Sequence, residues 1–214
     1  MTKMIIAVDG PAASGKGTLT ERLANHFDFA RLDTGLIYRA VGAKILRDDD
    51  NPEDPVVAVA AAQALCFTDL KQDGLRREEA GLAASQVAAL PDVRAVLLAF
   101  QRDFAACPPN GKLGAVLDGR DIGTVVCPDA HRKIFLMASA DVRAMRRYKE
   151  LQARGAEAIY ARILRDIKDR DTRDMSRSAA PLEPAKDAFV LDTSQLDADA
   201  VFAAALQYIN SQKL

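Results

Sequence analysis

A glycine-rich stretch close to the amino terminus contains a lysine and a threonine at spacings that suit phosphate chemistry. It consists of Gly10, Pro11, Ala12, Ala13, Ser14, Gly15, Lys16, Gly17 and Thr18. Glycines let the backbone fold closely around an anion, and amide groups at the start of a helix donate hydrogen bonds to it. The ammonium group of Lys16 adds a mobile charge for β- and γ-phosphates. We call residues 10–18 the phosphate loop and expect it to bind a phosphate chain.

The residue after the lysine departs from the common form of this motif. In the usual P-loop pattern a serine or threonine follows the lysine directly and binds Mg²⁺, whereas here Gly17 precedes Thr18. Thr18 is therefore the candidate metal ligand. A glycine-rich turn beside an unrelated lysine is the alternative, but the spacing and the strand-loop-helix context favour a phosphate site. Asp9, immediately before the loop, could face the metal or cap the turn.

Arginine is the second residue type whose pattern suggests phosphate binding, because its planar guanidinium forms paired hydrogen bonds with a phosphate. Arg170, Arg173 and Arg177 recur at spacings of three and four, so a continuing helix would place them along one face. The interleaved carboxylates are Asp166, Asp169, Asp171 and Asp174. On composition alone, a solvated helix with salt bridges is the favoured alternative.

The apolar pattern indicates the scaffold that must position these side chains. Residues 4–9 are mostly apolar without alternation, as in a strand buried on both faces of a parallel sheet. Further strands are expected at residues 115–118, 133–137 and 188–191, and helices at 140–154, 158–173 and 198–211. Strands that alternate with helices predict an α/β fold with ligands at the carboxyl ends of the strands.

Residues 48–82 interrupt this alternation. The segment opens with three aspartates, an asparagine and a proline, passes through an alanine-rich stretch, and contains the turn sequence Gln72-Asp73-Gly74. We interpret it as a small lobe inserted into the core. Residues 173–186 are charged and contain prolines, which predicts a loop before the last strand.

The overall composition limits the possible functions. The 214 residues carry 29 lysines and arginines against 30 aspartates and glutamates, which argues against a surface for nucleic acid or anionic membranes. The three cysteines lack a C-x-x-C pair, so neither a disulfide framework nor a zinc site is indicated. No apolar run approaches the length of a membrane span. We expect a cytoplasmic protein, and a monomer because no heptad pattern or long apolar stripe indicates an interface.

Four later segments carry the motifs of one enzyme family. They are residues 32–39 (LDTGLIYR), 83–89 (AASQVAA) with Arg94 beyond them, 118–124 (DGRDIGT) and 170–177 (RDTRDMSR). With the phosphate loop, in which glycine follows the lysine, the chain resembles nucleoside-monophosphate kinases, and bacterial cytidylate kinases in particular. The resemblance extends from residue 5 to about residue 193. Thr34 stands where the family often has serine, and residues 66–76 look shorter than in long bacterial members.

The resemblance implies an α/β fold of the P-loop nucleoside-monophosphate kinase type, with a central parallel sheet flanked by helices. One domain would span residues 1–214, with its core at about 1–47 and 83–214. A small lobe for the nucleoside monophosphate would occupy about 48–82, and a short lid about 143–157. The implied reaction is direct in-line transfer of the γ-phosphoryl of Mg-ATP to CMP, and also to dCMP, without a covalent enzyme intermediate.

Roles for individual residues follow from matching motif positions. The residues implied to bind the acceptor nucleotide are Asp33, Thr34, Arg39, Ser85, Arg94, Arg120, Asp121, Arg170, Asp174 and Arg177. Those implied to act on the transferring phosphoryl group are Lys16, Arg120, Arg170 and Arg177. Ser85, Arg94 and Asp121 would contact the cytosine, whose amino donor and ring acceptors suit a carboxylate, an arginine and a hydroxyl.

The lid is expected to add a cation to the ATP site. Arg143, Arg146 and Arg147 lie on the helix expected at 140–154, and Arg146 is the candidate ATP ligand. The alternative for each is an exposed basic helix face.

Other functions remain possible from the sequence. A P-loop kinase for another small acceptor, such as UMP, AMP or a non-nucleotide, would share the phosphate loop. A GTP-binding switch that acts without catalysis would usually carry an N-K-x-D motif, which this sequence lacks. A structural protein with a vestigial loop is disfavoured because Lys16, Thr18 and the arginines are all present.

Overall fold

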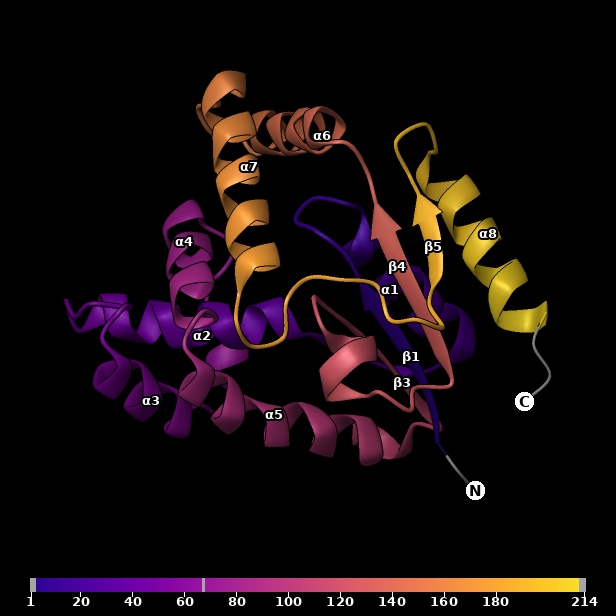
Figure 1. Ribbon diagram of the computed structural model, residues 1–214, viewed down its shortest axis with the longest axis horizontal. Helices are drawn as coiled ribbons and strands as arrows, with labels where there is room; N and C mark the ends of the chain where they lie inside the picture. The colour runs from indigo at the N-terminus through magenta and orange to yellow at the C-terminus, as the bar shows by residue number, and fades with distance from the viewer. Residues whose placement is uncertain (1–2, 67, 212–214) are drawn as a thin grey trace.

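The computed structural model describes residues 3–66 and 68–211 and contains a five-stranded parallel sheet (Figure 1). The strands are β1 (Met4–Asp9), β2 (Ala30–Asp33), β3 (Gly114–Gly119), β4 (Arg132–Met137) and β5 (Phe189–Asp192). Their order is β2-β3-β1-β4-β5, and every neighbouring pair is parallel. The carboxyl ends of all strands therefore meet at one edge of the sheet. The prediction of a parallel α/β sheet is confirmed.

Among the five strands, β2 is the one that the apolar pattern does not predict. Its four residues, Ala-Arg-Leu-Asp, include two charged side chains and, among the described strands, pair only with β3. As an edge strand it has alternating burial, with Ala30 and Leu32 buried. Thr34 and Gly35 form the first turn of a helix that follows β2 directly.

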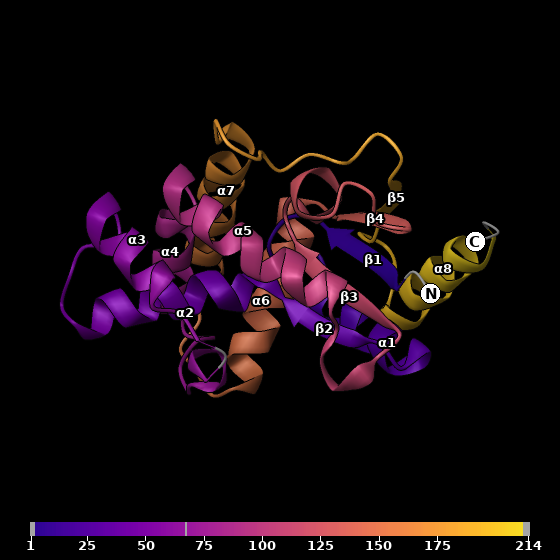
Figure 2. The same cartoon turned by 90° about the horizontal axis from the view of Figure 1, so that it is seen from below.

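Helices cover both faces of the sheet (Figures 1 and 2). On one face, α1 (Lys16–Phe27) and α8 (Ala198–Ser211) pack against Ile6 and Val8 of β1. On the other face, Ala7 belongs to a larger core built with α2 (Thr34–Arg47), α3 (Pro55–Gln63), α4 (Glu78–Val87) and α5 (Pro91–Ala106). Alternate side chains of one strand thus serve two cores, which explains the continuous apolar run of residues 4–9.

Two further helices lie at the carboxyl edge of the sheet. Helices α6 (Ala140–Ala153) and α7 (Tyr160–Ser176) share a small apolar cluster of their own, around Ala144, Ile163 and Ile167. Helix α7 continues three residues beyond its predicted end and stops before Arg177, which has an extended conformation. The spacing of Arg170, Arg173 and Arg177 would place them along one face only if the helix continued through all three. Because α7 ends before Arg177, they do not share one helix face.

The segment 48–82 contains α3, the short helix η1 (Asp69–Lys71) and the predicted turn, in which Gly74 has a φ of 87°. The predicted lobe boundary at residues 82 and 83 falls inside α4, which packs closely on α2. The division into core, lobe and lid stays a prediction. The remaining short helices are η2 (Pro109–Gly111) and η3 (Ile122–Val126).

No single helix among residues 3–66 and 68–211 has the length and apolar character needed to cross a membrane. Helix α4 and residues 91–111 pass that test only as a pair bent by 103°. Many of their apolar side chains, including Val87, Val93 and Leu97, are buried in the core below the sheet.

The contact between α2 and α4 depends on a glycine. A Cβ added at Gly42 would lie 2.7 Å from the Cβ of Ala83, so α4 rests directly on the α2 backbone. We expect Gly42→Ala to lower the free energy of unfolding by about 1 kcal/mol, because overpacking outweighs the gain in helix propensity. Thermal unfolding measures the effect, and Ala43→Gly calibrates the propensity contribution in the same helix. A raised Tm for Gly42→Ala would contradict this packing argument.

Candidate active site

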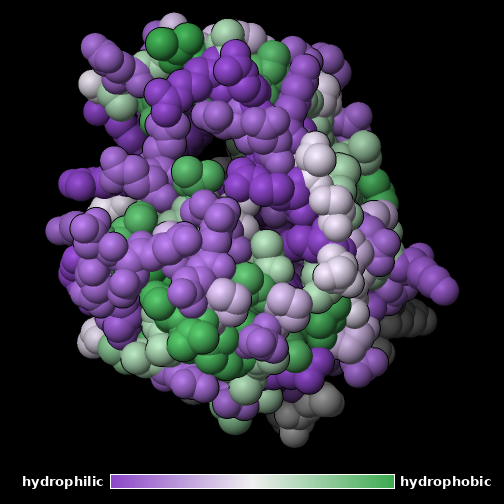
Figure 3. Space-filling view, turned by 60° about the vertical axis from the view of Figure 1, so that its left-hand side comes forward, coloured by the Kyte–Doolittle hydropathy of each residue, from purple (hydrophilic) through white to green (hydrophobic). Residues whose placement is uncertain are grey.

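A cleft of about 730 Å³ opens at the carboxyl edge of the sheet. The phosphate loop forms one wall, from Ala12 to Thr18. The other charged residues lining it include Asp33, Arg39, Asp118, Arg120, Arg146 and Arg170. Hydrophilic side chains surround a hollow on this side of the molecule (Figure 3). The structure thus places around one space several residues predicted to bind ATP and several predicted to bind the acceptor nucleotide.

The conformation of the phosphate loop follows from its glycines and from its position after β1. Gly10 has a φ of 144°, and a Cβ there would lie 2.1 Å from the carbonyl oxygen of Leu136, so only glycine fits. Lys16 begins α1, is 7% exposed, and donates a hydrogen bond from Nζ to the Pro11 carbonyl at 2.7 Å. Burial, reinforced by the charge of Arg120, lowers the pKa of Lys16 to about 7.

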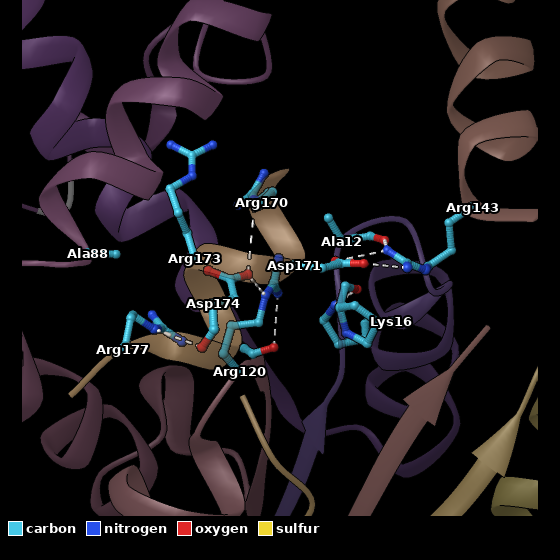
Figure 4. A network of polar contacts seen from close by, with 12 residues as sticks. Ala12, Lys16, Ala88, Arg120, Arg143, Arg170, Asp171, Arg173, Asp174 and Arg177 are labelled. Carbon is cyan, nitrogen blue, oxygen red and sulfur yellow. Dashed lines mark hydrogen bonds and ion pairs between the residues drawn. The ribbon is translucent and has the colours of Figure 1, made fainter. Parts of the chain in front are cut away.

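Across the cleft, arginines from two segments converge on one carboxylate. Arg120, just after β3, donates from Nε to Asp174 Oδ2 at 2.8 Å, and the Arg170 Nε lies 4.0 Å from the same oxygen (Figure 4). Burial alone would raise the pKa of Asp174, but Arg120, Arg170 and Arg177 together hold it below its ordinary value. Burial, together with the nearby Arg120, lowers the pKa of Arg170 to about 9. One carboxylate thus offsets several buried cations.

Two of these arginines keep buried nitrogen atoms that no hydrogen bond within the described residues satisfies. They are Arg170 Nε and Arg177 Nη2. The Nε of Arg177 donates to the Asp174 carbonyl at 3.3 Å. Buried guanidinium donors without partners suit an anionic oxygen ligand. Arg173 extends away from Asp174 in Figure 4 and is not part of this group.

A second group of predicted residues lies beside this cluster, on the side of α4 and α5. Arg94 from α5 forms an ion pair with Asp121, which follows β3, and both side chains are about nine-tenths buried. Arg94 also lies over the ring of Tyr38, 5.6 Å from its centroid. The hydroxyl of Ser85, on α4, is buried without a hydrogen-bond partner in the described chain. A carboxylate and a guanidinium are thus held together beside an aromatic ring, and a buried hydroxyl lies on α4.

Three other residues predicted to bind the acceptor nucleotide make contacts with other protein groups in this structure. Thr34 is buried and donates from Oγ1 to the Asp118 carbonyl at 2.7 Å. Arg39 lines the cleft, but its Nη1 donates to the carbonyls of Leu75 and Arg77 at 2.9 and 3.2 Å. Asp33 also lines the cleft, 3.5 Å from the guanidinium of Arg76. Both charged side chains thus contact the turn at residues 72–77.

The predicted lid arginine contacts the far end of the cleft. Arg146 on α6 donates to Thr193 Oγ1 at 3.0 Å and to the Thr193 carbonyl at 2.5 Å. Thr193 Oγ1 lies 3.2 Å from the Ser14 carbonyl of the phosphate loop. Arg146 is therefore held near the donor loop, and its binding of ATP stays a prediction.

Hard oxygen groups of the kind that Mg²⁺ prefers also line the cleft. Thr18 is exposed there on the first turn of α1, and the carboxylates of Asp33 and Asp118 face the same space. No group of three or more His, Cys, Asp or Glu in the described chain could hold a metal alone. Mg²⁺ is usually bound by one or two carboxylates together with substrate phosphates and water. The residues present fit that mode.

Three buried charged side chains near the site have partners that the sequence did not indicate. Asp118 accepts a hydrogen bond from Thr20 at 2.8 Å, and Arg143 forms a paired salt bridge with Asp171. Asp9 accepts hydrogen bonds from the amides of Ile122 and Gly123, both at 2.8 Å, and burial raises its pKa to about 6. Asp9 therefore caps backbone after β3, a partner that its position in the sequence could not indicate.

The sequence model of the family described as cytidylate kinase matches residues 6–211. The chain belongs to the cytidylate kinase family. The predicted resemblance is thus confirmed over nearly the whole chain, and the cleft just described is the candidate active site of a cytidylate kinase family member.

Curated relatives named cytidylate kinase are similar along their full length. The protein from Paramagnetospirillum magneticum is 60% identical over 209 residues, covering 98% of this chain and 99% of the relative. The protein from Methylocella silvestris is 55% identical, covering 97% and 94%. A crystal structure of an uncharacterized protein from Eubacterium ventriosum has a TM-score of 0.57 at 15% identity and covers 98% of this chain and 100% of that one. This last likeness concerns the fold alone.

The lowered pKa of Lys16 predicts proton uptake when the phosphate loop binds a phosphate chain. Above its pKa of about 7 the buried amine is largely neutral, and an anionic ligand raises its pKa toward the ordinary 10.5. Near pH 8.5 we expect binding of Mg-ATP to take up close to one proton. Calorimetry in two buffers of different ionisation enthalpy measures this uptake. Lys16→Met should abolish it, and equal uptake by the variant would contradict the assignment.

Proposed function

We propose that this protein transfers the γ-phosphoryl group of Mg-ATP to the 5′-phosphate of CMP, and also of dCMP, giving ADP and the nucleoside diphosphate. The observation that carries the proposal is the buried cluster of Arg120, Asp174 and Arg170 opposite the phosphate loop. Membership of the cytidylate kinase family supports the identity of the acceptor. The reaction is a direct in-line transfer, because the acceptor oxygen is already anionic and needs no general base.

Catalysis then consists of positioning and of electrostatic stabilisation. The phosphate loop and Lys16 hold the donor phosphates from one side. Arg120, Arg170 and Arg177 hold the acceptor phosphate and the transferring group from the other. Arg170 and Arg177 keep buried nitrogens without partners in the described chain, so donors for anionic oxygens are already in place and little reorganisation is needed during transfer.

The second group of residues reads the base. The Asp121 carboxylate accepts a hydrogen bond from the cytosine amino group, while Arg94 and the Ser85 hydroxyl donate to the ring acceptors. Tyr38 lies beside Arg94 and supplies an apolar wall. Uracil presents an acceptor where cytosine has its amino donor, so it would face the Asp121 carboxylate without a hydrogen bond.

Asp174 and Arg170 hold the ribose, and Thr34, Asp33 and Arg39 lie around the acceptor phosphate. Arg39 must exchange its contacts with the carbonyls of Leu75 and Arg77 for the acceptor, so binding moves the turn at residues 72–77. Thr18 and the nearby carboxylates would hold Mg²⁺ together with the phosphates of ATP, and the ion would supply positive charge that offsets theirs. We also propose that the protein acts as a cytoplasmic monomer, without nucleic-acid or membrane partners.

Acceptor selectivity tests this function directly. ADP release is measured with constant Mg-ATP while CMP, dCMP, UMP, AMP and GMP are offered in turn. We expect CMP or dCMP to lead in wild type, and Asp121→Ala to lose at least about tenfold in kcat/KM for CMP, because a buried hydrogen bond to the base is lost. The exposed Asp129, further along the same segment, provides Asp129→Ala as the matched control.

The outcome separates the competing functions. If UMP or AMP leads instead, the acceptor assignment fails while the kinase remains. If no nucleoside monophosphate stimulates ADP release, both the acceptor and the assignments of the arginines fail, and a kinase for a non-nucleotide acceptor or a nucleotide-binding switch is favoured.

Coupling of ATP cleavage to the acceptor gives a second test. The cleft is open in this structure, and in-line transfer to CMP without loss to water requires closure around both substrates. We expect ATP hydrolysis without acceptor to be slower than transfer to CMP by a factor of at least about 100. Phosphate release without CMP measures hydrolysis. A comparable basal rate would contradict coupled closure.

A further inference from the structure

The guanidinium of Arg143 donates hydrogen bonds from all three of its nitrogens to protein oxygens near the cleft. Its side chain is 5% exposed and donates to oxygens of three different segments. The Nε donates to the Ala138 carbonyl at 2.9 Å, after β4. The Nη1 donates to the Ala12 carbonyl at 3.2 Å and to Asp171 Oδ1 at 3.0 Å, and the Nη2 donates to Asp171 Oδ2 at 2.5 Å.

This arginine differs from its neighbours on α6. Arg146 and Arg147 line the cleft, whereas Arg143 does not. Its donors are already engaged by protein oxygens, so Arg143 is not arranged to contact a nucleotide. Figure 4 shows it reaching from α6 toward Ala12 and Asp171, away from the cluster around Asp174. A direct role in substrate binding is therefore disfavoured.

Asp171, the carboxylate that pairs with Arg143, lies on α7 among the residues predicted to bind the acceptor nucleotide. Asp171 directly follows Arg170 on α7 and precedes Asp174 by three residues. Because a helix turns as a rigid unit, fixing Asp171 fixes the rotation and height of both neighbours. The other end of the connection is the carbonyl of Ala12 in the phosphate loop. A single buried guanidinium thus joins the donor loop to the acceptor helix.

We propose that Arg143 and Asp171 form a positioning pair, which keeps Arg170 in register with the phosphate loop during phosphoryl transfer. The inference deepens the proposed function and rests on it. Cations on opposite sides of the transferring group must be placed within a fraction of an ångström, and a displacement of about 1 Å can reduce the rate about 100-fold. The planar fork of Arg143 gives that fixed geometry, because its two parallel hydrogen bonds allow little rotation.

The decisive variant is Asp171→Asn, which keeps the shape of the side chain and removes its charge. We expect kcat for CMP to fall about 10- to 100-fold, with the KM values for ATP and CMP changed by less than about threefold. Asp199→Asn is the matched control, because Asp199 forms an exposed salt bridge with Arg22, with N–O separation 2.7 Å, on α8. The control should retain wild-type kinetics.

A double-mutant cycle distinguishes positioning from general structural support. If the two residues act as a unit, Arg143→Gln with Asp171→Asn should have a kcat no lower than that of Arg143→Gln alone. Arg143→Lys keeps the charge without the fork and should recover little of the rate. Unchanged kcat in Asp171→Asn, additive losses in the cycle, or a rise in both KM values at constant kcat would each overturn the proposal.

Amide hydrogen exchange provides a readout that does not depend on the reaction. Loss of the pair should increase exchange both in residues 12–14 and around residue 171 in Asp171→Asn, but not in Asp199→Asn. Faster exchange in α7 alone would overturn the connection to the phosphate loop. If wild type shows no transfer to CMP while exchange changes as expected, the proposed function fails and the structural connection stands. If Asp171→Asn does not fold, Asp171→Glu carries the same comparisons, with the same outcomes expected and the same ones overturning the proposal.

Discussion

The accumulation of buried positive charge at one edge of the sheet is the constraint on which the rest of the structure depends. Lys16, Arg120 and Arg170 lie around one cleft, and burial and mutual repulsion lower the pKa of Lys16 and of Arg170. Asp174 offsets this repulsion only in part. Such an arrangement is unfavourable without an anion and becomes favourable when one binds. The fold must therefore hold these cations in place in spite of their repulsion.

The parallel sheet supplies most of that restraint. The phosphate loop follows β1 and Arg120 follows β3, and these two strands are neighbours paired along their whole length. Asp9, at the end of β1, accepts hydrogen bonds from the backbone just beyond Arg120 and Asp121. Helix α7 is not part of the sheet, and ion pairs of Asp171 with Arg143 and of Asp174 with Arg120 join it to the elements around the cleft. The positions of the cations on α7 thus depend on ion pairs, whereas the positions of the cations that follow the strands are set by backbone pairing in the sheet.

Much of this arrangement could be predicted from the sequence. Short apolar runs located β1, β3 and β4, and the motifs located residues that line the cleft and the group proposed to read the base. Strand β2 was missed because only its pairing with β3, not its composition, makes it a strand. The partnership of Arg94 with Asp121, and of Arg143 with Asp171, joins residues about 27 apart in the chain. Local patterns extend over a few residues and cannot identify such partners.

The position of the first strand in the middle of the sheet has a consequence for biosynthesis. Both neighbours of β1 come much later in the chain, since Met4 pairs with Gly114 and Ile6 with Arg132. During synthesis this apolar segment remains unpaired until the chain has been made at least as far as residue 114. Long-range pairing of this kind slows folding and exposes apolar surface in the nascent chain. The strand that places the phosphate loop is therefore also an apolar segment that stays open to non-native contacts through much of synthesis.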